Sequence, residues 1–270
     1  MKRINLEELK LIQLDVLQTI HQFCVENDIK YSLGCGSMLG MIRHKGYIPW
    51  DDDIDIYLLR KDYNKLVSSF PNKYKGIYDI DSLERNPYCE RPYAKAYDVR
   101  TIAEEEAEFI FKIGVNIDVY PIDKVPENYN EWKHYNTLRR FIQRLYELKL
   151  IKINNKRSIY KTIVIVLGKI ILFPFKTRSL ASYISKFAQK HNDSDSSKVF
   201  ECVQGMLQKR PFDCCLFERL ELMPFEDRMF YGFEDYDKYL SNAYGDYMQL
   251  PPEEKRISHH DIVAYWKKDN

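Results

Sequence analysis

Ile48-Pro49-Trp50-Asp51-Asp52-Asp53-Ile54-Asp55-Ile56 is the stretch that decides the fold, because it places four carboxylates within five residues beside an apolar segment. Two carboxylates about 4 Å apart repel each other by roughly 4 kcal/mol at an effective dielectric constant near 20. A positive group is therefore expected beside them. Magnesium prefers hard oxygen ligands and often combines one or two carboxylates with substrate phosphates. The stretch thus predicts phosphoryl or nucleotidyl transfer.

A strand is predicted over residues 53–59, where apolar and polar side chains alternate. Residues two apart on a strand share a face, so Asp53 and Asp55 are expected to project together, opposite the apolar side chains. These two are the first candidate metal ligands. Asp51 is either a ligand or supporting group of the same metal, or a loop carboxylate that caps backbone amides. Asp52 points the other way and is expected to be structural.

A third carboxylate is expected from residues 115–120, a predicted strand in which Asp118 stands alone between β-branched residues. One interpretation is a solvent-facing aspartate at a strand edge. The other is an inward carboxylate on a neighbouring strand, which would complete a three-carboxylate metal site. The presence of Asp53 and Asp55 favours the second interpretation.

Residues 1–125 alternate predicted helices and strands, which is typical of an α/β or α+β domain. Asn5, with Glu8 three residues later, is typical of a helix start. Helices are predicted at 5–28, 38–43 and 60–70, the last ended by Pro71-Asn72, and strands at 30–33, 53–59, 76–81, 93–99 and 115–120.

Residues 126–270 are predicted to be mostly helical, with a tail at about 236–262 that packs back toward the active site. Long helical patterns are predicted at 131–152, 158–175 and 177–191. The apolar run within 159–175 is too short to span a bilayer. It is either a core helix or a helix in the plane of a membrane, where basic side chains meet anionic headgroups. Those basic residues are Lys156, Arg157, Lys161, Lys169, Lys176 and Arg178.

The composition is that of a packed globular protein without a bulk charge. Lys and Arg number 41 and Asp and Glu 40 among 270 residues, so no general attraction to nucleic acid is expected. The six cysteines include no C-x-x-C spacing, and the first residues lack the apolar core of a signal peptide. We therefore expect reduced thiols and a cytoplasmic protein.

A glycine-rich segment, Gly34-Cys35-Gly36-Ser37, precedes the acidic stretch. A Gly-Ser turn that opens a helix offers backbone N–H groups and the helix dipole to a phosphate. The pairing of Gly36-Ser37 with Asp53-Ile54-Asp55-Ile56 resembles the nucleotidyltransferase fold shared with DNA polymerase β. Fifteen residues separate Ser37 from Asp53, slightly more than is usual in that superfamily. This resemblance implies a polymerase-β-like core with a mixed sheet.

A narrower resemblance covers nearly the whole chain and is weakest over 126–210. The segment from Gly36 to Ile56 resembles the signature of the LicD family, which includes bacterial phosphocholine transferases and is related to fukutin. The resemblance continues at Lys95, Asp98-Val99-Arg100-Thr101, Asn116-Ile117-Asp118-Val119-Tyr120-Pro121-Ile122-Asp123, Tyr239-Leu240, Tyr244-Gly245-Asp246-Tyr247-Met248, Pro251-Pro252-Glu253-Glu254-Lys255-Arg256 and His259-His260.

The LicD resemblance implies a phosphotransferase that moves phosphocholine, or a similar phospho-alcohol, from a CDP-activated donor such as CDP-choline to a sugar hydroxyl, releasing CMP. Acceptors would be glycans of teichoic acid, lipopolysaccharide or capsule, often lipid-linked at the cytoplasmic face of the membrane. The expected cofactor is Mg²⁺, or Mn²⁺ in its place. In the generic two-metal scheme Asp118 would also accept the proton of the attacking hydroxyl.

The remaining candidate residues each carry two interpretations. Gly36 and Ser37 contact the donor phosphate or simply begin a helix. Trp50 stacks on a base or on a choline ammonium, or braces its loop. The other candidates either bind substrate or have a structural role, which is charge balance, a surface ion pair or packing of the tail. They are Arg43, His44, Lys45, Lys95, Arg100, His259 and His260.

Two rival functions follow from the same residues. A true nucleotidyltransferase would take a nucleoside triphosphate and release pyrophosphate. A non-catalytic nucleotide- or glycan-binding module would keep the fold without turnover, although pure binding does not require three clustered carboxylates.

Overall fold

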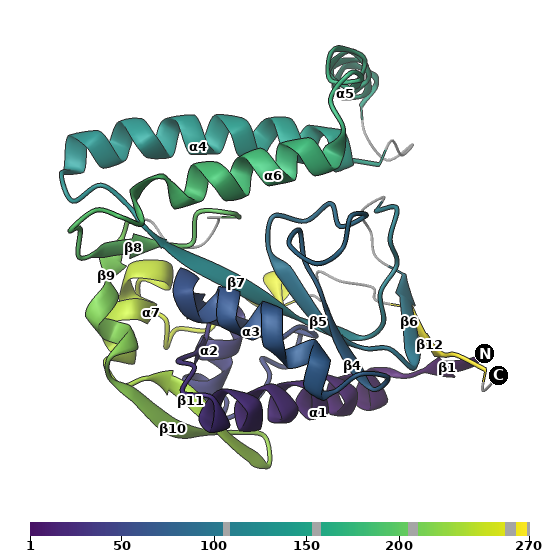
Figure 1. Ribbon diagram of the computed structural model, residues 1–270, viewed down its shortest axis with the longest axis vertical. Helices are drawn as coiled ribbons and strands as arrows, with labels where there is room; N and C mark the ends of the chain where they lie inside the picture. The colour runs from purple at the N-terminus through teal and green to yellow at the C-terminus, as the bar shows by residue number, and fades with distance from the viewer. Residues whose placement is uncertain (105–108, 153–157, 205–209, 257–262, 269–270) are drawn as a thin grey trace.

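The acidic stretch leads directly into a strand of a mixed sheet. The computed structural model describes residues 1–104, 109–152, 158–204, 210–256 and 263–268. Within these ranges the main strand order is β2-β3-β7-β5-β4, and β8 and β9 continue from β7 (Figure 1). The bounds are β2 Ser32–Leu33, β3 Asp55–Leu59, β4 Tyr78–Asp81, β5 Ala94–Asp98, β7 Asn116–Lys124, β8 Lys198–Phe200 and β9 Phe212–Asp213.

The register of the three inner strands sets the position of the charged residues. β3 runs parallel to β7 with Asp55 opposite Asp118, and β5 runs antiparallel to β7 with Lys95 opposite Asp118. Directly opposed residues point to the same face of a sheet. The sheet therefore carries Asp55, Asp118 and Lys95 in one row across three strands.

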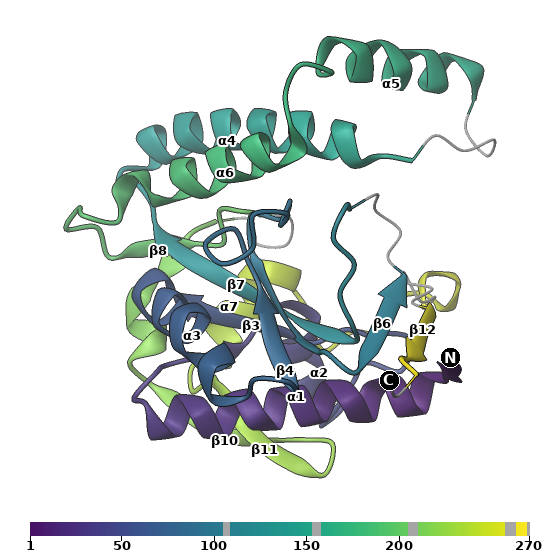
Figure 2. The same ribbon diagram turned by 45° about the vertical axis from the view of Figure 1, so that its right-hand side comes forward.

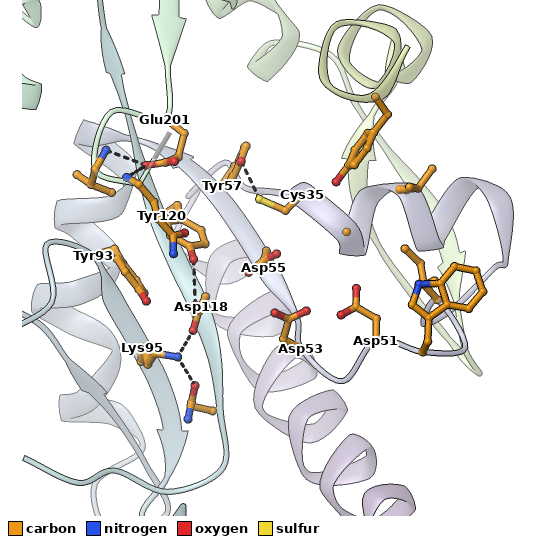
Figure 3. Close-up of a pocket in the computed structure, with 18 of the residues that line it drawn as sticks. Cys35, Asp51, Asp53, Asp55, Tyr57, Tyr93, Lys95, Asp118, Tyr120 and Glu201 are labelled. Atoms are coloured by element: carbon orange, nitrogen blue, oxygen red, sulfur yellow. Dashed lines mark hydrogen bonds and ion pairs between the residues drawn. The ribbon is translucent and has the colours of Figure 1, made fainter. Parts of the chain in front are cut away.

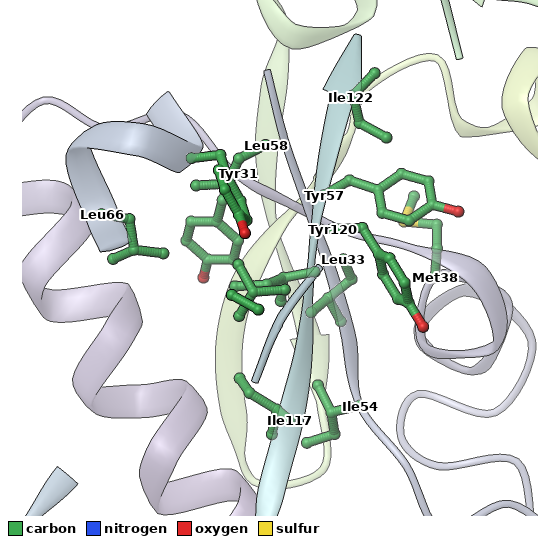
Figure 4. Close-up of a cluster of buried hydrophobic side chains, with 14 of the residues drawn as sticks. Tyr31, Leu33, Met38, Ile54, Tyr57, Leu58, Leu66, Ile117, Tyr120 and Ile122 are labelled. Atoms are coloured by element: carbon green, nitrogen blue, oxygen red, sulfur yellow. The ribbon is translucent and has the colours of Figure 1, made fainter. Parts of the chain in front are cut away.

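Helices cover the two faces of this sheet. α1 (Leu6–Glu26) and α3 (Arg60–Lys73) contact one face, and α2 (Cys35–Arg43) contacts β3 from the other. Figure 4 shows the resulting core, with Leu66 of α3 and Met38 of α2 on opposite sides of the sheet. Tyr57 and Tyr120 point toward α2 (Figure 4), so the aspartates two residues before each of them belong to the α2 face.

The first helix begins where its capping pattern predicts. The side chain of Asn5 accepts a hydrogen bond from the backbone N–H of Glu8 at 2.8 Å, which satisfies one of the unpaired amides of the first turn. The prediction that α3 ends before Pro71 is wrong, because the helix continues to Lys73. Proline removes one hydrogen bond but holds a helical φ, so a last turn tolerates it.

A helical layer lies over one end of the sheet. α4 (Tyr129–Leu150) and α6 (Thr177–Ala188) pack side by side, and α5 (Ile159–Ile171) projects beyond them (Figure 2). Short 3-10 helices occur at Gln189–His191, Cys214–Phe217 and Glu253–Lys255. Among the described residues no helix is both long and apolar enough to cross a bilayer.

The prediction of a mostly helical second half is wrong over residues 198–204 and 210–233. This region contains β8, β9 and a hairpin of β10 (Leu220–Phe225) and β11 (Arg228–Phe233), before α7 (Tyr236–Tyr244). The two hairpin strands pair through a turn in which Glu226 has a φ of 56°. Burial at every second position, at Met223 and Phe225 of β10, is typical of a strand and not of a helix. The division of the chain near residue 125 stays a prediction.

The two ends of the chain meet in a small separate sheet. β1 (Lys2–Ile4) and β6 (Thr101–Glu104) both pair with β12 (Val263–Trp266). A minor apolar cluster lies under this sheet and includes Ile4, Val115 and Ala264. The sheet therefore ties the far end of the chain to the turn that follows β5.

A buried ion pair joins the ends of the two central strands. Arg60, which follows β3, donates to both carboxylate oxygens of Asp123 on β7 at 2.8 and 2.6 Å. Both side chains are buried, and Asn192 donates to the same carboxylate at 2.7 Å. The ion pair links β3 and β7 toward their carboxyl ends, whereas Asp55 and Asp118 lie toward the amino ends of the same two strands.

Replacing Asp123 with Asn is expected to destabilise the fold, because it leaves the Arg60 guanidinium buried without a counter-charge. Breaking one side of a buried pair costs about 3–5 kcal/mol in the free energy of unfolding. Urea denaturation measures this cost. Asp79→Asn, in an exposed pair with Arg85, is the matched control and should cost about 0–1 kcal/mol. Equal losses in the two variants would contradict this role of the buried pair.

Candidate active site

The four carboxylates of the predicted cluster come from two segments of the chain and line one cavity of about 1170 Å³. Asp51 and Asp53 come from the loop before β3, Asp55 begins β3, and Asp118 comes from the middle of the sheet on β7. Figure 3 shows all four around the same space. The structure excludes the less favoured interpretation of Asp118, a solvent-facing aspartate at a sheet edge, because β7 lies between β3 and β5.

Lys95 holds Asp118 in place. Its Nζ lies 2.6 Å from Oδ1 of Asp118 and also donates to Oδ1 of Asn116 at 3.0 Å. The hydroxyl of Tyr120 donates to Oδ2 of Asp118 at 3.0 Å. Both oxygens of Asp118 are therefore engaged, and Lys95 supplies the positive charge that the acidic cluster requires on this side.

Asp51, Asp53 and Asp55 crowd their carboxylates together, and burial and mutual repulsion act on them. Burial raises the pKa of the Asp55 carboxyl well above its usual 3.8, and the charges of Asp53, Asp118 and Asp51 raise it further, against the effect of Lys95. Burial also raises the pKa of Asp51, while a hydrogen bond with the Asp53 side chain lowers it. Another cation or shared protons would relieve this repulsion.

The donor chemistry of Asp51, Asp53 and Asp55 fits a hard divalent cation, because all three offer carboxylate oxygens to the same cavity. The fit is incomplete as the side chains lie. Across the described ranges, no three Asp, Glu, His or Cys residues form a ready-made metal site. Asp118 is already bound by Lys95 and Tyr120. The three-carboxylate metal site therefore stays a prediction.

The backbone of the acidic loop is fixed from two distant elements. Gln13 of α1 is buried and donates to the carbonyls of Asp52 at 2.9 Å and of Asn116 at 3.1 Å. The carboxylate of Glu226, at the turn of the β10–β11 hairpin, accepts from the Tyr47 N–H at 2.9 Å. Sequence reasoning missed both residues. The one available signal was a glutamine inside the apolar stripe of α1.

The glycine-serine segment positions the carboxylates. A Cβ on Gly36 would lie 2.7 Å from Oδ2 of Asp51, so a larger residue there would displace that carboxylate. The hydroxyl of Ser37 is buried and accepts from the N–H of Asp55 at 2.9 Å. Gly36 lines the cavity, whereas Ser37 braces the start of β3 from behind.

The basic residues before the acidic loop separate in the structure. Arg43 lines the cavity and donates to the Tyr247 carbonyl at 2.9 Å and to Nε2 of His44 at 3.0 Å. Lys45 and His44 do not contribute to the cavity lining, and the Lys45 carbonyl accepts from the N–H of Glu226. Trp50 lines the cavity, and the Arg256 guanidinium lies 5.8 Å from its ring centroid.

Of the other predicted substrate residues, Lys95 lines the cavity. Tyr244, Tyr247 and Lys255 of the tail line it as well, although they were not predicted to bind substrate. Arg100 lies outside the lining, where its Nη2 contacts Oδ2 of Asp98 at 2.5 Å, so the structure does not bring it to the carboxylates. His259 and His260 lie outside the described residues.

The far end of the cavity is aromatic and acidic. Tyr93 and Tyr120 have ring centroids 4.6 Å apart, and α4 adds further side chains from above. No sequence signal pointed to this end, because the contributing segments lie far apart in the chain and partly in 126–210. Its lining includes Tyr93, Tyr120, Phe109, Gln143, Tyr146, Glu147 and Glu201.

Comparison with known proteins places this site in a family. The family described as "LicD/FKTN/FKRP, nucleotidyltransferase domain" matches residues 28–156. The lipopolysaccharide cholinephosphotransferase LicD of Haemophilus influenzae is 32% identical over 98% of this chain and 99% of its own length. The chain belongs to the LicD family. The family match spans the carboxylates, the Gly36 turn and Lys95, which are the residues that meet in the cavity.

Two uncharacterized rickettsial proteins are similar in sequence to parts of this chain. One, from Rickettsia typhi, is 27% identical over 50% of the chain and 51% of its own length. The other, from Rickettsia prowazekii, is 30% identical over 42% of the chain and 41% of its own length.

Replacing Asp55 with Asn is expected to stabilise the metal-free protein at neutral pH. A carboxyl whose pKa is raised on folding penalises the folded state once the pH exceeds its unfolded pKa, and the penalty reaches its full value above the folded pKa. The variant should therefore melt at a higher temperature than the wild type at pH 8. This advantage should shrink toward pH 4, where the wild-type carboxyl is protonated.

Thermal melting in EDTA buffer from pH 4 to 8 measures this difference. Asp193→Asn, at an exposed aspartate, is the control and should follow the wild type throughout. A lower melting temperature for Asp55→Asn at pH 8 would show that the charge of Asp55 is compensated in the folded protein.

Proposed function

We propose that this LicD-family chain transfers phosphocholine, or a similar phospho-alcohol, from a CDP-activated donor to a sugar hydroxyl of a cell-surface glycan precursor and releases CMP. The proposal rests on the family and on one structural observation. Four carboxylates, Lys95 and the first turn of α2 border a single cavity. That combination of anionic and cationic groups suits phosphate transfer better than simple sugar binding.

The cavity has room for both substrates. Pockets for a single small ligand usually measure about 300–1,000 Å³. At about 1170 Å³ this cavity exceeds that range, and its lining includes Trp50, the carboxylates and the aromatic pair Tyr93 and Tyr120. A donor and an acceptor would then meet at the carboxylates, as a direct transfer requires.

The reaction would be an in-line displacement at the distal phosphorus of the donor. The acceptor oxygen forms a bond to that phosphorus, the bond to the bridging oxygen breaks, and CMP leaves with the bridging oxygen. Asp118 is proposed to accept the hydroxyl proton, with Lys95 and Tyr120 fixing its orientation. Lys95 also places a positive charge beside the phosphate.

Asp51, Asp53 and Asp55 are proposed to hold Mg²⁺, or Mn²⁺, with Asp118 as the further ligand predicted from the sequence. The chemistry that a bound divalent ion supplies is neutralisation of charge on the phosphate oxygens. The chain itself orients these carboxylates through Ser37 and Gln13, which fix the backbones of Asp55 and Asp52.

The aromatic end supports choline as the transferred alcohol. A quaternary ammonium is attracted to aromatic faces and to nearby carboxylates. Tyr93 and Tyr120 offer such faces, and the Lys95 ammonium already lies 5.9 Å from the Tyr93 centroid. Glu147 and Glu201 add negative charge to the same end. We place the reaction in the cytoplasm, at the inner face of the membrane, without a nucleic-acid partner.

Replacing Asp53 with Asn is expected to lower turnover by at least about a hundredfold, because one carboxylate of the phosphate-transfer cluster is lost. Release of CMP from CDP-choline, with a lipopolysaccharide glycan acceptor and magnesium, measures turnover. Asp193→Asn is the matched control and should stay active. Pyrophosphate released from a nucleoside triphosphate would instead identify a nucleotidyltransferase. Unchanged CMP release by Asp53→Asn would refute the role of this carboxylate.

Replacing Tyr93 with Leu is expected to raise the KM for CDP-choline selectively, by about tenfold, because an aromatic face for the ammonium is removed. Steady-state kinetics with CDP-choline and CDP-glycerol test the difference, since glycerol carries no charge. Thermal shifts with CDP-choline, CDP-ethanolamine, CDP-glycerol and CDP-ribitol give an independent ranking of donors. A parallel loss for CDP-glycerol would assign Tyr93 a structural role instead.

A further inference from the structure

α5 exposes a continuous apolar surface to solvent. It projects beyond the paired helices α4 and α6 (Figure 2). Six large apolar or aromatic side chains of α5 are between 49% and 76% exposed, and two more follow in the turn after it. They are Tyr160, Ile163, Val164, Leu167, Ile170 and Ile171 on the helix, followed by Phe173 and Phe175.

The exposed residues form one stripe that faces away from the protein. Their spacing of three or four residues places them along one side of the helix. The opposite side faces α4, where a Cβ on Gly168 would lie 2.5 Å from the Leu148 side chain and where Leu172 is buried. Helices of water-soluble proteins normally turn such a stripe toward the core. This helix instead keeps its contact with α4 narrow and presents its apolar stripe outward.

The stretch of sequence that contains this helix carries only positive charge. Residues 148–192 contain ten of the 41 Lys and Arg residues of the chain and none of its 40 Asp and Glu residues. The other 225 residues therefore hold 31 basic and 40 acidic side chains. A chain that is nearly neutral overall thus concentrates positive charge in the segment of sequence that contains its exposed apolar helix. Apolar and basic side chains together match the acyl and headgroup layers of an anionic lipid surface.

We infer that α5 and its basic flanks bind an anionic membrane, with the helix lying in the plane of the headgroups and its outward stripe inserted among the acyl chains. Thirteen residues cover about 20 Å of helix, less than the hydrocarbon thickness, so the helix lies on the membrane without crossing it. A second copy of the chain is a poorer partner. In a two-fold dimer the same surface meets itself, which would bring like charges together.

α4 connects the membrane-facing helix α5 to the cavity. Gln143, Glu147 and Leu150 of α4 line the cavity. Leu148 of α4 packs against Gly168, and the Lys149 ammonium donates to the Leu172 carbonyl at 2.9 Å and to the Phe175 carbonyl. A membrane-bound α5 would therefore hold one wall of the cavity close to the lipid surface. The membrane proposal itself does not depend on which group the enzyme transfers.

Co-sedimentation of the full chain with vesicles tests the inference. The wild type is expected to bind vesicles of equal parts phosphatidylglycerol and phosphatidylcholine at least about tenfold more strongly than pure phosphatidylcholine vesicles. A triple variant, Ile163→Ser, Leu167→Ser and Ile170→Ser, should lose at least about tenfold of the anionic-vesicle binding. The charge variant Lys169→Glu with Lys176→Glu should lose binding to the same vesicles while its outward apolar stripe stays intact.

The matched control is Leu6→Ser, Leu11→Ser and Val25→Ser, at leucines and a valine of α1 that are 55–57% exposed. This control should bind vesicles like the wild type, and circular dichroism should show that all variants stay folded. Equal vesicle binding by the α5 triple variant and the wild type would overturn the inference. Wild-type protein that binds anionic vesicles no better than pure phosphatidylcholine vesicles would also overturn it. So would a wild-type dimer in sedimentation equilibrium that is lost in the α5 triple variant.

Discussion

The parallel pairing of β3 with β7 is the interaction on which the rest of the site depends. It sets Asp55 directly opposite Asp118, and the antiparallel neighbour β5 then brings Lys95 to the other side of Asp118. A slip of one residue in this register would turn Asp118 to the opposite face of the sheet. The buried Arg60–Asp123 pair at the other end of the two strands opposes such a slip, because its geometry is satisfied in one register only.

The cluster is tolerated because the surrounding structure holds it from several directions. Like charges in a buried site favour local rearrangement that would separate them. Gln13 of α1, Ser37 of α2 and Glu226 of the distant hairpin each fix a backbone segment next to the carboxylates. The acidic loop is thus held by residues from both ends of the chain. The crowded carboxylates lower stability, and they favour the arrival of positive charge.

Sequence reasoning predicted the carboxylate cluster well and its surroundings less well. The alternation around Asp53 and Asp55 indicated a strand, and the lone Asp118 was assigned to a neighbouring strand, which the pairing of β3 and β7 confirms. The engagement of Asp118 by Lys95 and Tyr120 was not foreseen. Arg100 was grouped with Lys95, but it follows β5 in a turn and pairs with Asp98 outside the cavity. The nucleotidyltransferase-type core and the metal ligands stay predictions.

The sequence by itself determined the local elements of residues 1–104 and 109–125 and the family of the chain. Helix caps, alternating strands and a long acidic motif depend on residues close together in the sequence. Only the tertiary structure decided the register that aligns Asp55, Asp118 and Lys95, the hairpin at 220–233, and the aromatic end of the cavity. It also decided which side of α5 faces outward. These features depend on contacts between distant segments, because packing selects one arrangement among several that local pattern allows.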